Sequence, residues 1–446
     1  MDANSATPDQ HTPASRSRVS SVVARMPYPV FAIYTALIAF TAYSAMYAFR
    51  KPFTAAEYGG QWLFGTTLSL KAALVVSQIL GYTVSKYIGV KVCSELSPAA
   101  RRGMLVRVIL VSLLGLLIFG LVPGEWKVAA IFLSGLPLGM VWGIVVSFLE
   151  GRRCSDFVMA ALCGSFIVSS AVSKDVGRWL MRDWQVPENW MPAATGVLFL
   201  PAFLLAVWLL AALPLPNKDD QALRKPRSPM DKQARRAFLN RFAPGLLLLF
   251  VFYFFLMAFR DFRDNYGVEI FQSLGYGSDQ TGLFTRAETP VAIGSLIVLA
   301  LLNAVKSNRM ALMLAYGFMM LGMVILFGST LAKNHQMLGG LAWMVATGLG
   351  TYLAFAPINA VLFERLMAAS GSVGTAVFGI QLADAIGYTG SVVVQLYKDL
   401  GSPKETHLAY FSHFSLAMGV GGCVLSVLGA LYFHRVTRPS PTPPVE

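Results

Sequence analysis

Charged residues are scarce in this chain, and their scarcity excludes a soluble protein. Asp, Glu, Lys and Arg make up only 13% of the 446 residues, whereas soluble domains carry about 25%. The four cysteines are spaced for neither a disulfide framework nor a zinc site. The five histidines show no metal-ligand spacing. We therefore expect no metal, no cofactor and no enzymatic activity.

Two sequence signals are missing as well. No glycine-rich phosphate-binding loop is present, so primary active transport by this chain alone has no support. Residues 1–21 are polar and lack the apolar core of a signal peptide. We expect residues 1–25 to be a disordered cytoplasmic tail, and the first hydrophobic helix to direct insertion.

Long apolar runs are what the chain has in abundance. Hydrophobic residues make up 55% of it, and the mean hydropathy is +0.58. A run of about 20 residues crosses a ~30 Å hydrocarbon layer as a helix. We predict an all-α membrane protein with twelve transmembrane helices, over residues 28–52, 62–86, 104–122, 127–149, 155–177, 190–213, 243–265, 281–304, 309–332, 338–362, 373–397 and 408–433.

The basic residues predict the orientation in the membrane. The net charge is +13, but most Lys and Arg lie in the tails and in alternate loops, which indicates membrane lipids as partners and no nucleic acid. By the positive-inside rule, both termini are cytoplasmic, and we expect a multi-pass protein of the bacterial cytoplasmic membrane. Residues 214–241 are rich in proline and basic residues. We interpret them as a linker against anionic headgroups, with a specific partner site as the alternative.

An internal repeat supports a division into two halves. The first span ends in the letters AFRK at residues 48–51, and the seventh ends in AFRD at residues 258–261. We predict an N-terminal six-helix bundle over 26–213, the linker, a C-terminal six-helix bundle over 242–434, and a cytoplasmic tail over 435–446. Duplicated halves place a substrate near the midplane between them.

Charged residues inside the predicted spans are candidates for function, because each costs roughly 2.5–3.5 kcal/mol at a helix centre. Lys71 falls about nine residues into the second span, so we expect it in the central cavity, as a substrate contact or paired with Asp384. Asp384 lies in the eleventh span. It is a candidate for proton coupling, or alternatively a packing acid neutralised by Lys71 or by polar neighbours such as Gln381.

Residues 47–53 read YAFRKPF, and Tyr43, Tyr47 and Arg50 share one helical face. This string resembles the Y-x-x-R-K-x-F of the organophosphate:phosphate antiporter family, which belongs to the major facilitator superfamily. Residues 135–142 read GLPLGMVW, similar to the family's G-x-x-x-G-M-x-W, which ends here in Trp142. Its small residues should let helices pack closely. The segment around Arg260 and the position of Glu288 also resemble the family. One departure is the loop signature expected after the second helix, where residues 81–86 carry Ser85 in place of Asp.

The resemblance implies an alternating-access carrier in which Arg50 and Arg260, one from each half, converge on a phosphate-like anion. A guanidinium suits that role because it binds phosphate or carboxylate with two parallel hydrogen bonds. The face of Tyr43 and Tyr47 would line the pore. We also expect Lys51 to pair with Glu288 between the halves on the outer side, and Asp264 to replace an acid that the family carries one position later.

We therefore predict a secondary active transporter of a small organic anion that is phosphorylated, phosphonate-like or a carboxylate. Antiport with phosphate and coupling to protons are both open. The alternatives are a membrane sensor of a phosphorylated metabolite that transports nothing, and an exporter of an anionic metabolite such as a siderophore. By the resemblance, we expect a monomer.

Overall fold

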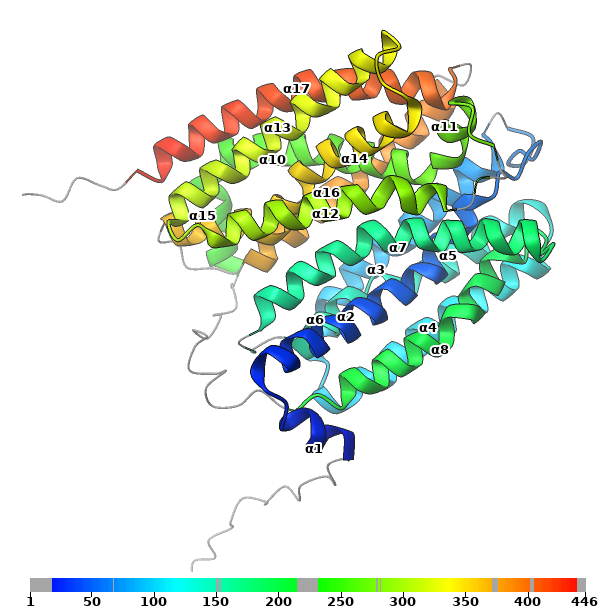
Figure 1. The fold of residues 1–446 in the computed structure, drawn as a ribbon, viewed down its shortest axis with the longest axis horizontal. Coiled ribbons are helices and arrows are strands. Elements are labelled where there is room, and N and C mark those ends of the chain that lie inside the picture. Colours follow the sequence, from blue (N-terminus) through cyan, green and yellow to red (C-terminus); the bar gives the residue numbers. More distant parts are fainter. Residues whose placement is uncertain are drawn as a thin grey trace, which may run out of the picture.

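Helices make up nearly all of the computed structural model, which describes residues 18–66, 68–149, 152, 154–214, 232–277, 280, 282–370, 376–401 and 405–438. They form two bundles that lie side by side (Figure 1). The first bundle contains α2 (Tyr28–Arg50), α3 (Leu70–Glu95), α4 (Pro98–Leu121), α5 (Lys127–Leu138), α6 (Val141–Leu149), α7 (Ser155–Asp183) and α8 (Met191–Ala211). The second contains α10 (Lys232–Asn265), α11 (Gly267–Ser273), α12 (Leu283–Ala304), α13 (Asn308–Asn334), α14 (Gly340–Pro357), α15 (Phe363–Ser370), α16 (Ala376–Leu396) and α17 (His407–Val436).

The helices confirm the prediction of an all-α membrane protein. Within the described ranges, 10 helical segments are long and apolar enough to cross a membrane. The helices α3 and α16, of 26 and 21 residues, occupy the places of the second and eleventh predicted spans. They carry the charged residues Lys71, Lys86 and Asp384 among their apolar ones. Together these segments make up the twelve predicted crossings.

The start of α3 corrects the predicted second span. A β-bridge joins Trp62 to Ser69 just before the helix, and Phe64 has a φ of 43°, which a helix does not allow. The helix begins only after Ser69, whose hydroxyl accepts a hydrogen bond from the Ala72 amide at 3.3 Å. Lys71 therefore lies in the first turn of α3, and Lys86 lies within the helix instead of in a loop.

The predicted tails and linker are also partly helical. The helix α1 (Arg18–Ala24) falls within the tail expected to be disordered. The linker was predicted to extend to residue 241, but α10 begins at Lys232 because the amphipathic run before Phe242 continues the helix. Residues 1–17, 215–231 and 439–446 lie outside the described residues.

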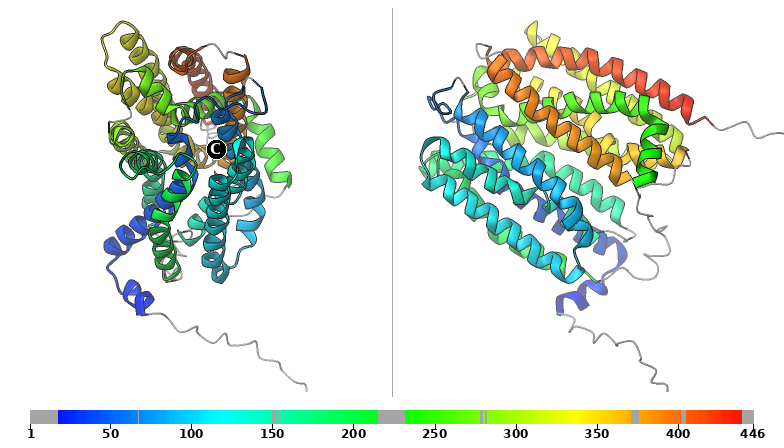
Figure 2. Two further views of the ribbon diagram at one scale, coloured as in Figure 1. Left: turned by 90° about the vertical axis from the view of Figure 1, so that its right-hand side faces the viewer. Right: turned by 180° about the vertical axis from the view of Figure 1, so that it is seen from behind.

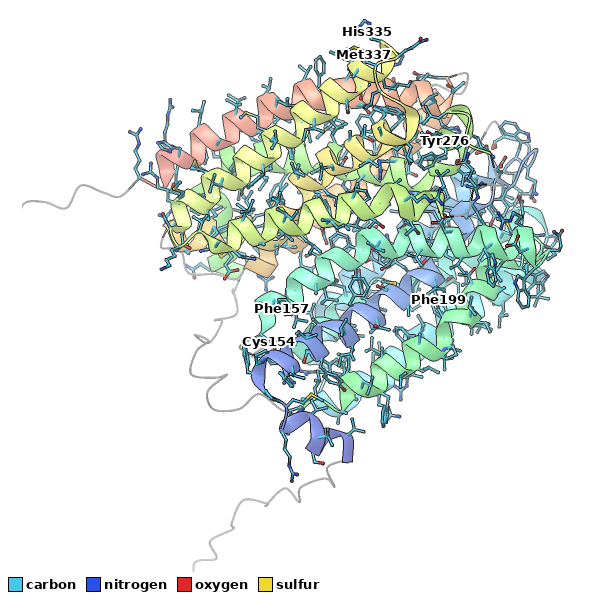
Figure 3. The ribbon with its side chains drawn as sticks, viewed as in Figure 1. Cys154, Phe157, Phe199, Tyr276, His335 and Met337 are labelled. Carbon is cyan, nitrogen blue, oxygen red and sulfur yellow. The ribbon has the colours of Figure 1, made fainter. Side chains whose placement is uncertain are left out.

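The two ends of the molecule differ in character. The helix α1 and the end of α17 lie at one end, which we call the proximal end (Figures 1 and 2). Cys154 lies at this end, whereas Tyr276, His335 and Met337 lie at the opposite, distal end (Figure 3). Loops at the distal end expose the tryptophans Trp62, Trp126, Trp184 and Trp190. Tryptophans collect at membrane–water interfaces, so this end marks one interface.

Close packing of α3 on α5 depends on two glycines of the GLPLGMVW string, as the sequence predicted. A Cβ atom at Gly135 would lie 2.8 Å from the Gln78 carbonyl oxygen, and one at Gly139 would lie 2.5 Å from that of Tyr82. We expect Gly139→Ala to lower the free energy of unfolding by about 1–3 kcal/mol through overpacking, measured as thermal unfolding in detergent. Gly328→Ala, where a Cβ meets nothing within 4 Å, should not destabilise, and equal losses at both sites would contradict this reading.

Candidate functional site

Arg50 is a buried cation that makes no direct ion pair with any carboxylate in the described part of the chain. It ends α2, is only 3% exposed, and its Nε atom has no hydrogen-bond partner among the described residues. The guanidinium carbon lies 3.8 Å from the centre of the Tyr82 ring and 5.8 Å from that of Tyr47. Ring faces attract a cation but do not replace the hydrogen bonds that it loses when it leaves water. The site therefore retains capacity for an anionic guest.

Arg260 comes from α10 in the other bundle and already has an acidic partner. Its Nε and Nη2 atoms donate to the Asp261 Oδ1 atom at 3.1 and 2.7 Å. The other oxygen of Asp261 accepts from the Ser391 hydroxyl at 2.8 Å. The Arg260 guanidinium also stands over the Phe355 ring, 4.4 Å from its centre. Arg260 and Asp261 thus form a neutral pair held by α16.

The two arginines approach the same region between the bundles. Tyr47 of α2 and Tyr388 of α16 each lie near both Arg50 and Arg260. Tyr82 and Tyr388 bring their rings to 5.3 Å across the two bundles. Both arginines point inward, since Arg50 is buried and the Arg260 side chain is 13% exposed. Their role as binding residues remains a prediction.

Aromatic rings from both bundles surround this region. Trp142 of α6 packs on Tyr43 at 4.9 Å and on Phe166 of α7 at 6.4 Å. Phe166 in turn contacts Tyr352 at 6.3 Å and Phe355 at 5.7 Å, both on α14. Tyr43 and Trp142, which the sequence nominated, thus belong to a continuous aromatic wall that the second bundle completes.

The distal end holds a charge cluster that joins the bundles, and it corrects one predicted pair. Lys51 contacts Asp264 at 2.5 Å and donates to the Asn265 side chain at 2.8 Å. Asp264 also binds Lys174 at 2.7 Å and accepts from the Ser170 hydroxyl at 2.6 Å. The predicted pair of Lys51 with Glu288 is wrong.

Glu288 has a partner within its own bundle. It lies 2.5 Å from Arg263, whose Nη2 atom also donates to the Met344 carbonyl at 2.6 Å. The face of α12 that carries Glu288 therefore turns toward α10 and α14. Lys51 instead meets the end of α10, where Asp264 takes the place that the sequence analysis gave to Glu288.

Lys71 also has a different position from the one predicted. It pairs with Glu269 of α11 at 2.5 Å, because the late start of α3 places it at the distal end and not in the central region. Asp175 of α7 closes the same end, since its carboxylate accepts from the Phe284 and Thr285 amides at 3.3 and 2.7 Å and so caps α12 of the other bundle. Several ion pairs and hydrogen bonds thus hold the distal ends together.

Lys86 is the partner of Asp384, which the sequence analysis missed. The two side chains are 2.5 Å apart, and the Tyr253 hydroxyl donates to the other Asp384 oxygen at 3.0 Å. The proposed pair of Asp384 with Lys71 is therefore wrong. The Gln381 side chain is half-buried and makes no hydrogen bond to any residue that the structure describes. Lys86 was not predicted as a buried charge because the predicted second span ended at residue 86, which placed this lysine in a loop.

The pair between Lys86 and Asp384 connects α3 to α16 on the proximal side of Tyr82 and Tyr388. Removing one member of a buried pair costs about 3–5 kcal/mol, because the other charge stays buried alone. We expect Asp384→Asn to lower the melting temperature in detergent strongly. The exchanged variant Lys86→Asp with Asp384→Lys should recover most of the loss, whereas a double variant no more stable than the single one would argue against pairing.

A chain of hydrogen bonds connects Arg260 to Lys51. From Asp261 it passes through the Ser391 hydroxyl to the Gln395 side chain at 2.8 Å. Gln395 then accepts from Asn265 at 3.4 Å, and Asn265 accepts from Lys51 at 2.8 Å. Ser391 and Gln395 are fully buried. The arginine region and the distal charge cluster thus share one polar network.

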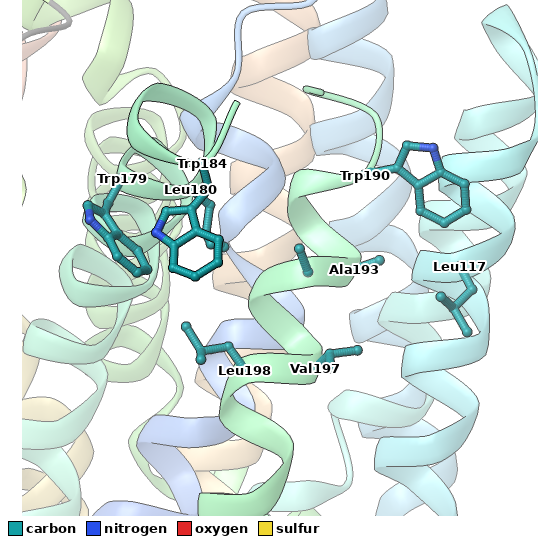
Figure 4. Close-up of a pocket in the computed structure, with 9 residues that line it drawn as sticks. Leu117, Trp179, Leu180, Trp184, Trp190, Ala193, Val197 and Leu198 are labelled. Carbon is teal, nitrogen blue, oxygen red and sulfur yellow. The ribbon is translucent and has the colours of Figure 1, made fainter. Parts of the chain in front are cut away.

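An apolar groove lies elsewhere, near the distal end of the first bundle (Figure 4). Its lining is entirely hydrophobic: Leu117, Trp179, Leu180, Trp184, Trp190, Ala193, Ala194, Val197 and Leu198. It has no charged group for an anion and lies on α4, α7 and α8, away from both arginines. Such a surface suits the acyl chains of the bilayer.

Comparisons with known proteins agree with the fold. Residues 52–436 match a family model described as a family of unknown function, DUF5690. No curated protein matches the sequence. A crystal structure of a D-xylose-proton symporter is 14% identical, with a TM-score of 0.56, over 91% of this chain and 97% of its own. A mutant of the nucleoside transporter NupG is 11% identical, with a TM-score of 0.58, over 90% and 99%. The chain therefore has the major facilitator fold predicted from the sequence.

Proposed function

Because the chain belongs to the DUF5690 family, whose function is unknown, we propose a function from the site itself: a secondary active transporter of a small organic anion. The buried, unpaired guanidinium of Arg50 at the junction of two bundles carries this proposal. A buried charge without a partner is costly to keep, and it is retained where a guest supplies the missing anion. The solved structures that share this fold are those of transporters, which favours a guest that is carried across the membrane.

The arrangement of contacts suits alternating access. The distal ends are held by charge pairs between the bundles, and a further pair, Lys86 with Asp384, lies on the proximal side of the arginine region. An anion bound to Arg50 from one bundle and to Arg260 from the other would favour the state that brings both together. Differential affinity of this kind is what shifts a conformational equilibrium.

The proposed substrates are the anions predicted from the sequence, which are phosphorylated, phosphonate-like or carboxylate compounds. Phosphate exchange requires no titratable group beyond the arginines. Proton coupling through Asp384 would require this carboxylate to release Lys86 during the cycle. The orientation with cytoplasmic termini, the bacterial cytoplasmic membrane and a monomeric state are part of the same proposal, supported by the distribution of basic residues and by the resemblance.

Purified protein in proteoliposomes tests the proposal. We expect uptake of at least one radiolabelled anion from a panel of inorganic phosphate, methylphosphonate and benzoate, above that of empty liposomes. Binding that raises thermal stability without any flux would favour the sensor instead. Flux only from the side of the termini would favour an exporter. Absence of both binding and flux across all three anion classes would contradict the proposal.

A further inference from the structure

The charges around Arg50 limit the charge of its guest. Apart from the distal cluster of Lys51, Lys174 and Asp264, the described residues place three cations here, Arg50, Arg260 and Lys86, and two anions, Asp261 and Asp384. Asp261 and Asp384 each contact one of the cations at 2.5–2.7 Å, so both of those pairs are neutral. Of these five groups, Arg50 is the one that makes no ion pair within the described part of the chain.

Resting on the proposed function, we propose that the substrate is a monoanion with a flat apolar body, of the aryl monocarboxylate class. One carboxylate provides the planar pair of oxygens that a single guanidinium binds with two hydrogen bonds. A phosphate monoester carries close to two charges at neutral pH. Its second charge would have to displace Asp261 from Arg260 and leave that carboxylate buried without its cation, which is unfavourable.

The walls of the site indicate the flat body. Tyr47 and Tyr82 lie beside Arg50, Phe355 lies under Arg260, and Trp142 and Phe166 close the space between the bundles. Flat rings pack on such walls in stacked or edge-to-face geometry, worth about 0.5–1.5 kcal/mol per pair beyond the burial of area. A sugar ring has no π-system and would make none of these ring–ring contacts.

The test is thermal stabilisation of the purified full chain by four matched probes at pH 7.5: benzoate, benzamide, cyclohexanecarboxylate and phenyl phosphate. We expect benzoate to bind at least ~10-fold more tightly than benzamide, which lacks the charge, and more tightly than phenyl phosphate, which carries a second one. Cyclohexanecarboxylate, which is not flat, should bind more weakly than benzoate.

Asp261→Asn sharpens the test because it removes one negative charge while preserving the shape of the side chain. The variant leaves Arg260 uncompensated, so we expect the preference to shift toward phenyl phosphate by about tenfold, or 1.4 kcal/mol. If this variant does not fold, the ranking in the wild type decides alone. Preference of the wild type for phenyl phosphate would overturn the monoanion inference and leave the proposed function intact. If none of these anions stabilised the protein, and neither phosphate nor methylphosphonate did so, both the monoanion inference and the proposed function would be overturned.

Discussion

Replacing Arg50 with glutamine is expected to remove anion binding and, at the same time, to stabilise the empty protein. Hydrogen bonds to a charged group contribute about 1.5–3 kcal/mol each, so loss of the guanidinium should weaken anion binding at least ~100-fold. The empty protein should gain stability because it no longer buries a cation without an acid. A residue with a purely structural role would show the opposite sign.

Thermal unfolding in detergent, with and without benzoate and phosphate, measures both effects in one experiment. Arg50→Lys keeps the charge but loses the paired geometry, so it should retain weak binding. Arg182→Gln is the matched control, because Arg182 is exposed at the distal surface beside Asp183, and it should change neither stability nor binding. A lower melting temperature of empty Arg50→Gln, with anion binding unchanged, would contradict the proposed role of Arg50 in binding the anion.

Replacing Asp264 with asparagine is expected to open the distal end. Asp264 compensates Lys51, which follows α2, and Lys174 of α7, and it accepts from Ser170 as well. Its loss leaves two buried cations facing each other in the closed state, and breaking buried pairs of this kind costs about 3–5 kcal/mol. A change of that size shifts a two-state equilibrium by more than ~100-fold, so the population should move toward a state in which both lysines reach water.

Spin labels report this change directly. Trp184 and Met337 are 66% and 81% exposed and belong to distal loops of different bundles, so cysteines can be introduced there once the four native ones are replaced. We expect the distance distribution between the labels to lengthen in Asp264→Asn. Asp183→Asn, at an exposed acid of the same end, serves as control. If the distance distribution of Asp264→Asn coincided with that of Asp183→Asn, Asp264 would not be what holds the distal end closed.

The buried charged residues could be predicted from the sequence, whereas their ion-pair partners mostly could not. Arg50, Arg260, Asp264 and Asp384 stand out because a charge in an apolar helix is costly, and composition reveals this directly. Partners depend on helix rotation and depth, which the local pattern does not determine. Because the helix begins only at Leu70, Lys71 lies at the distal end and Lys86 lies inside the helix beside Asp384.

The aromatic wall shows the same limit. Tyr43 and Tyr47 could be placed on one face of α2 from their spacing alone. Phe166, Tyr352 and Phe355 looked like ordinary apolar residues, because nothing local shows that α7 and α14 face each other. The pairing of Arg260 with Asp261 was equally hidden, since neighbours in a helix usually diverge. This pairing determines how much positive charge the site retains.

Counterflow in proteoliposomes tests most directly whether an anion bound at Arg50 crosses the membrane. Vesicles loaded with unlabelled benzoate are diluted into labelled benzoate, and the transient accumulation of label is recorded for the wild type, Arg50→Gln and Arg182→Gln. We expect accumulation for the wild type and for Arg182→Gln, and none for Arg50→Gln, with the same pattern for any anion that stabilises the protein. Accumulation by Arg50→Gln at the wild-type rate would contradict transport through this guanidinium.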